Sequence, residues 1–91
     1  MRLVPDPAPL RTALQAVVRE LDSIHAEETS PDGLVTATVD GRGRLVELYL
    51  DTRVFRTTDS RALAAAILDT VRRAAGTAAD HAGQALRKEL R

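Results

Sequence analysis

The chain has 91 residues, which is enough for one small domain, and its 13 basic and 13 acidic residues give a formal net charge of zero. Aromatic residues make up only 2% of it, so we expect a core of aliphatic and alanine side chains, which bury little surface each. So thin a core favours an oligomer in which a second copy completes it. The absence of cysteine excludes disulfides, thiolate nucleophiles and cysteine-based zinc sites.

Charge is distributed unevenly along the chain. Residues 1–40 carry three basic and seven acidic residues, a net charge of −4, whereas residues 41–91 carry ten and six, a net charge of +4. A basic second half can face a polyanion. No apolar run approaches the ~20 residues that a transmembrane helix needs, so we expect a cytoplasmic protein with no membrane contact.

The first element is a predicted helix from about Pro7 to about His25, preceded by a loose tail at residues 1–5. Asp6 and Pro7 are typical of a helix start. The apolar residues of this helix are spaced 4, 3, 4 and 3 apart: Leu10, Leu14, Val17, Leu21 and Ile24. This heptad seam fits an ordinary amphipathic core helix or a contact between two copies, and the two interpretations are compatible.

A β-hairpin is predicted between Asp32 and Asp51. Its strands are Leu34 to Val39 and Leu45 to Leu50, and glycines in the connecting loop suit a tight turn. Residues 26–29 could add a short third strand. Before the hairpin, Glu27 and Glu28 are interpreted as part of a solvated loop, since no histidine clusters with them.

Side chains of the hairpin alternate between its two faces. One face, expected to pack on the helices, carries Val35, Ala37, Val39, Val46, Leu48 and Leu50. The other face mixes polar residues with Leu34, Leu45 and Tyr49. A two-stranded sheet with open edges and a half-apolar outer face is a candidate for pairing with another copy.

A second helix is predicted from about Ser60 towards Leu90, after a segment in which Phe55 is expected to anchor the junction between sheet and helix. Its apolar face carries Leu63, Ile67, Val71, Ala74, Ala78 and Ala82. Such a helix would be ~45 Å long, so its second half must project or pack on a partner. Gly76 and Gly83 leave three alternatives open there: close helix approach, a kink or fraying.

No catalytic constellation is evident, and we predict that the protein is not an enzyme and needs no cofactor, metal or small-molecule ligand. His25 and His81, both assigned to helices, lie far apart in sequence and lack a nearby nucleophile. The glycines of the hairpin loop join two strands, whereas a phosphate-binding loop precedes a helix. Basic side chains at the hairpin tip and along the second helix fit either solubility or phosphate contacts.

Three segments in and after the hairpin have a recognisable wording: residues 32–41 (DGLVTATVDG), 44–51 (RLVELYLD) and 53–55 (RVF). They resemble the YbaB/EbfC family of bacterial nucleoid-associated proteins, and the arginines of the hairpin and the alanine-rich helices resemble the actinobacterial branch. The length and the residue patterns predict a single α+β domain over residues 1–91, consisting of a long helix, an antiparallel hairpin and a long helix, and the resemblance spans roughly Leu14 to Ala79 of it. The resemblance implies a tweezer-shaped homodimer that binds duplex DNA in the nucleoid.

From the resemblance and the basic second half we predict a homodimer that binds DNA through backbone phosphates with little sequence specificity. The alternative is a dimeric protein-interaction module that kept the fold without the DNA role, which the zero net charge and the acidic end of the first helix favour. The residues predicted to contact DNA are Arg42, Arg44, Arg72, Arg73, Arg87 and Lys88. Those predicted for the dimer interface are Leu14, Leu21, Leu34, Leu45 and Tyr49.

Overall fold

The computed structural model describes residues 8–56 and 59–89 of the chain. Its elements are helix α1 (Ala8–Ser23), strands β1 (His25–Thr29), β2 (Val35–Asp40) and β3 (Leu45–Leu50), the short 3-10 helix η1 (Thr52–Arg56) and helix α2 (Ser60–Glu89). The three strands form one antiparallel sheet in the order β1-β2-β3. The predicted α+β fold, including its third strand, is confirmed. The loose tail, the helix start at Asp6 and Pro7, and Leu90 lie outside the described residues.

Helix α1 ends two residues earlier than predicted, and His25 belongs to a strand. The helix closes at Ile24, whose N–H donates to the Leu21 carbonyl oxygen at 3.3 Å, while the Ser23 hydroxyl donates to the Glu20 carbonyl oxygen. The chain then pairs His25 with Asp40 of β2. This strand makes the sheet three-stranded, which is the number needed for independent stability.

Helix α2 begins at a side-chain cap and runs without a break. The Asp59 carboxylate accepts a hydrogen bond from the Ala62 N–H at 2.9 Å, which satisfies one of the unpaired first-turn amides. The helix continues through Gly76 and Gly83 to Glu89. Fraying, one of the three alternatives for these glycines, is therefore not observed at either position.

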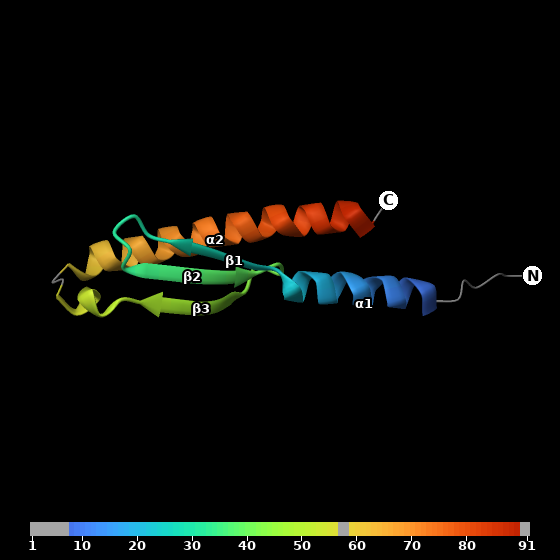
Figure 1. Ribbon diagram of the computed structural model, residues 1–91, viewed down its shortest axis with the longest axis horizontal. Coiled ribbons are helices and arrows are strands. Elements are labelled where there is room, and N and C mark those ends of the chain that lie inside the picture. The colour runs from blue at the N-terminus through green and yellow to red at the C-terminus, as the bar shows by residue number, and fades with distance from the viewer. Residues whose placement is uncertain (1–7, 57–58, 90–91) are drawn as a thin grey trace, which may run out of the picture.

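The core is a single layer between α2 and the sheet. Ala74 and Ala78 of α2 pack with Ala26 of β1 and with Ala37 and Val39 of β2. Helix α2 lies over β1 and β2 and leaves β3 largely uncovered. The prediction that both helices cover the sheet is wrong: no residue of α1 is buried, because the helix continues beyond the end of the sheet (Figure 1).

The predicted role of Phe55 is also wrong. Val54 is buried, whereas the Phe55 side chain is 85% exposed. Both residues lie in the short helix η1, where consecutive side chains point in different directions. Val54 is the residue that turns inward, so the aromatic ring projects into solvent.

The molecule is elongated, because α1 and the second half of α2 both extend beyond the same end of the sheet (Figure 1). The molecule extends over 72 × 21 × 16 Å with a Cα radius of gyration of 18.7 Å. A compact domain of this length would have a radius of gyration of about 12 Å. Near the sheet, Val17 and Leu21 of α1 face Ala85 and Leu86 of α2 across a shallow depression.

Candidate nucleic-acid interface

The β2–β3 turn is built around the carboxylate of Asp40. Its Oδ1 accepts hydrogen bonds from the backbone N–H groups of Arg42 and Arg44 at 2.9 and 3.0 Å, and Gly43 takes a positive φ of 83° to complete the turn. The Arg44 Nε donates to Asp40 Oδ2 at 2.8 Å. These bonds favour the ionised carboxylate, and the two from Arg44, above all its backbone N–H, hold the pKa of Asp40 below its usual value.

Both predicted arginines of this turn also form ion pairs with helix α1. Arg42 Nη1 and Arg44 Nη2 lie 3.2 and 3.3 Å from the same oxygen, Asp22 Oδ1. We call Asp22, Asp40, Arg42 and Arg44 the tip cluster. The Arg42 and Arg44 side chains are still 43% and 60% exposed, so an incoming anion can reach them.

Arg73, another predicted contact, is held against strand β1. Its guanidinium donates to the Thr29 carbonyl oxygen at 3.2 Å and pairs with Glu28 and Asp69 at 3.5 and 3.2 Å. Next to it, the Thr77 hydroxyl donates to Glu28 at 3.1 Å. These contacts give Arg73 a structural role in fixing α2 on the edge of the sheet.

Arg72, Arg87 and Lys88 are exposed and have no hydrogen-bond or ion-pair partner among the described residues. Arg72 lies on the face of α2 turned away from the sheet, since its neighbours Thr70 and Ala74 are fully buried. Arg87 and Lys88 lie on the part of α2 that projects beyond the sheet. The structure therefore separates the six predicted residues into ion-paired and unpaired groups of three.

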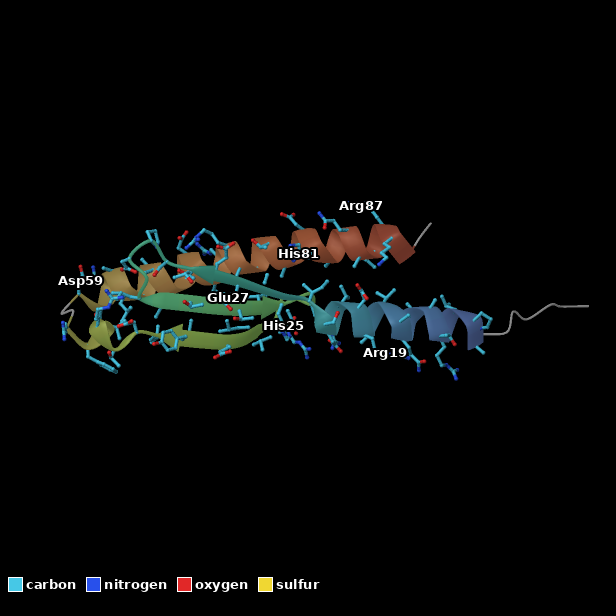
Figure 2. All side chains as sticks on the ribbon, in the orientation of Figure 1. Arg19, His25, Glu27, Asp59, His81 and Arg87 are labelled. Carbon is cyan, nitrogen blue, oxygen red and sulfur yellow. The ribbon has the colours of Figure 1, made fainter. Side chains whose placement is uncertain are left out.

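The sequence reasoning did not single out Arg11 and Arg19, which are exposed on α1. Figure 2 labels Arg19 on α1 and Arg87 on α2, the two helices that extend beyond the sheet. Neither Arg11 nor Arg19 forms an ion pair in the part of the chain that the structure describes. The net acidity of residues 1–40 concealed these two side chains, although their position on a projecting helix could have identified them.

The residues predicted for a dimer interface lie in different environments. Leu21 is half-buried beside α2, and Leu34 is half-buried beside Ala62 and Leu63 at the start of α2. Leu14, Leu45 and Tyr49 are 56%, 49% and 56% exposed. They are therefore available to a second copy.

Strand β3 is the larger uncovered surface, and every residue in it is exposed. Leu48 pairs with Ala37 and Leu50 pairs with Val35, so Leu48 and Leu50 share the sheet face on which α2 lies, as predicted. They are nevertheless 37% and 38% exposed, because α2 lies over the other two strands. We call Leu45, Val46, Leu48, Tyr49 and Leu50 the β3 surface.

The outer face of the sheet is polar by comparison. A shallow hollow of about 250 Å³ there is lined by Thr36 and Thr38 between Glu27 and Glu47, with Tyr49 beside them. The described residues contain no group of three or more side chains suited to hold a metal ion. Within the same residues, no helix is long and apolar enough to cross a membrane.

The fold and these surfaces define a class, that of small α+β proteins with a three-stranded sheet and two projecting helical arms. The model of the YbaB/EbfC DNA-binding family matches residues 8–90, and the chain belongs to this family. The family is one of DNA-binding proteins and not of enzymes. The family resemblance noted in the hairpin is thereby confirmed.

One solved structure shares the fold over nearly its whole length. It is an uncharacterized protein, HP0035 from Helicobacter pylori, with a TM-score of 0.63 and 17% identity over 91% of this chain and 90% of that one. At this identity the likeness shows the fold alone. A search of curated proteins finds no match.

Proposed function

We propose that the protein is a homodimer that binds duplex DNA through the phosphate backbone with little sequence specificity, and that it is associated with the nucleoid in the cytoplasm. Membership of a DNA-binding family is the observation that carries this proposal. Cations on both arms, among them Arg19 and Arg87, are exposed and form no ion pair within the described residues. They support the proposal, because neutralising phosphates with such cations releases counterions and gives affinity without reading bases. Arg72, Arg87 and Lys88 are the primary contacts proposed.

The ion-paired arginines Arg42, Arg44 and Arg73 remain secondary contacts in this proposal. A partly exposed ion pair contributes only about 0–1 kcal/mol, so a guanidinium can exchange a carboxylate for a phosphate at little cost. Arg42 and Arg44 are the more exchangeable, because Arg73 also donates to a backbone oxygen.

The β3 surface supports the homodimer. Apolar side chains on both faces of an open edge strand are a strong template for pairing with another chain. A two-fold contact through the outer face would bring Glu27 and Glu47 of two copies close together. Leu48 and Leu50 have no such penalty, so we propose that a second copy covers them and pairs with the edge of β3, with Leu45 and Tyr49 at its border.

The remaining predicted interface residues fit this dimer less directly. Leu21 and Leu34 are partly covered within the chain itself, whereas Leu14 is exposed on the arm. We propose that Leu14 contacts the second copy if the α1 helices of the two copies lie side by side.

The test is a salt titration of duplex binding with protein whose mass in solution has been measured. If about six phosphates are engaged, affinity should fall about 1000-fold between 50 and 200 mM salt. Two duplexes of unrelated sequence should give similar affinities. No binding at about 50 mM salt, or binding that ignores salt, contradicts the proposal. In that case capture of a stable protein partner would favour the interaction-module alternative.

A further inference from the structure

In the tip cluster, the Asp22 carboxylate at the end of α1 forms ion pairs with Arg42 and Arg44 of the β2–β3 turn. Asp22 lies in the last turn of α1, where the helix carries no basic residue of its own. A negative side chain is unfavourable there, because the carbonyl end of a helix is itself partly negative. The guanidiniums of Arg42 and Arg44 supply the missing positive charge from the hairpin turn.

The two carboxylates of the cluster differ in accessibility. The Asp40 side chain is 4% exposed and is committed to the turn by its backbone hydrogen bonds. The Asp22 side chain is 43% exposed, and the hydrogen bonds that its Oδ1 accepts within the described residues come from the guanidinium nitrogens of Arg42 and Arg44. Asp40 therefore fixes the turn and the base of Arg44, whereas the Asp22 contacts can open without disturbing the turn.

We propose that Asp22 is an autoinhibitory residue, an internal anion that competes with DNA phosphates for Arg42 and Arg44. This inference rests on the proposed function and concerns the regulation of the same interface. A phosphate that recruits the two arginines removes the cations that compensate Asp22 at the end of α1. DNA binding at the hairpin tip and firm attachment of the α1 arm are therefore coupled, each weakening the other.

Backbone contacts beside the cluster report on this attachment. The Gly41 N–H donates to the Leu21 carbonyl oxygen at 3.0 Å, one residue before Asp22, and the N–H of Ile24 donates to the same oxygen. If the ion pairs of Asp22 hold α1 against the turn, breaking them should speed the exchange of the Gly41 and Ile24 amide protons with solvent. This readout needs no DNA.

The experiment compares Asp22→Asn with Glu20→Gln, a matched control that removes the same charge from the same turn of α1. Glu20 forms no ion pair within the described residues. Anisotropy with a short, labelled, mixed-sequence duplex at about 50 mM salt should give an affinity about fivefold higher for Asp22→Asn. Glu20→Gln should change it less than about twofold, since its charge is solvated and screened.

Two further measurements isolate the cluster. In an Arg42→Gln, Arg44→Gln background, Asp22→Asn should no longer raise the affinity. In the free protein, Asp22→Asn should speed amide exchange at Gly41 and Ile24, and Glu20→Gln should not.

The outcomes separate this inference from the proposed function. Equal gains from Asp22→Asn and Glu20→Gln, or an undiminished gain without the two arginines, would overturn the inference while leaving DNA binding intact. An affinity for Asp22→Asn that does not exceed the wild-type affinity would likewise overturn the inference alone. Failure of both proteins to bind at low salt would overturn the inference and the proposed function together.

Discussion

The Gly41 N–H and the Leu21 carbonyl oxygen meet at 3.0 Å, and a Cβ placed on Gly41 would lie 2.7 Å from that oxygen. This contact joins the end of α1 to the hairpin turn by backbone alone. No side chain fits between the two segments, so glycine is required for a close approach and not for an unusual backbone angle.

Replacing Gly41 with alanine should therefore loosen α1 and lower the free energy of unfolding by about 1–3 kcal/mol, the usual cost of forcing atoms into a packed site. Urea denaturation followed by circular dichroism measures the change. The matched control is Gly76→Ala, because nothing lies within 4 Å of a Cβ there. That control should stabilise the protein by about 0.5–1 kcal/mol through helix propensity. Equal effects of the two substitutions would show that the approach at Gly41 is not tight.

The uncovered β3 surface leads to a prediction about the oligomer. Leu48→Asp should yield a folded monomer. Leu48 is already partly exposed within one chain, so a charge there remains solvated in the monomer but would be buried in the dimer interface. Light scattering coupled to size-exclusion chromatography gives the mass, and circular dichroism checks the fold. Ala79→Asp, which adds the same charge at an exposed position of α2, should remain dimeric. A wild-type mass of one chain at micromolar concentration would contradict the proposed dimer.

Regular patterns in the sequence predicted the elements and most of their faces. The face predicted for Leu45 is wrong, because a β-bulge in β3 pairs Leu45 with Val39 on the side of the sheet where α2 lies. The apolar period of α2 identified Ala74, Ala78 and Ala82 as core residues, and strand alternation identified Val35, Ala37 and Val39. Both patterns record how a local backbone repeats, so they are readable without the tertiary structure. Phe55 has no such pattern because it lies in a short connection, and the tendency of large apolar residues to be buried gave the wrong answer there.

Patterns within single elements could not show how the elements are placed relative to one another. Strand alternation predicted the correct face of the sheet for Leu48. It could not predict that α2 lies over β1 and β2 and leaves this residue partly exposed. In the same way, Arg42 pairs with Asp22 across 20 positions and Arg73 bonds Thr29 across 44. The ion pair of Arg73 with Asp69 is different in kind, because the two residues are four positions apart on one helix and such a pair follows from helical spacing alone.

Acid should weaken the hairpin turn. The pKa of Asp40 lies below its usual value of 3.8 because backbone and side-chain donors from Arg44 favour the ionised form. Because the pKa of Asp40 is lower in the folded state than in the unfolded state, its ionised carboxylate stabilises the fold at every pH above the unfolded-state pKa. This contribution is lost as the pH falls below about 4. Urea midpoints should therefore be nearly constant from about pH 7 to 5 and fall below about pH 4. Asp40→Asn should be less stable at neutral pH and show a flatter decline in acid; an equally steep decline would assign the acid sensitivity to other carboxylates.

Neighbouring arginines on α2 offer the sharpest separation of binding from stability. Arg72 is exposed without a partner among the described residues, whereas Arg73 bonds to β1. Arg72→Gln should keep the free energy of unfolding within about 0.5 kcal/mol of wild type. Because one phosphate contact is lost, it should also reduce the slope of log affinity against log salt by about 0.9.

Arg73→Gln should instead cost about 1 kcal/mol of stability, because the Thr29 carbonyl oxygen and two carboxylates lose their shared donor. It should change the salt slope less than Arg72→Gln does. Since the two variants differ by one position and remove the same charge, long-range electrostatics is nearly the same in both. Urea denaturation and salt-titrated anisotropy on both proteins decide the matter. A larger loss of slope for Arg73→Gln would mean that DNA draws this arginine away from β1.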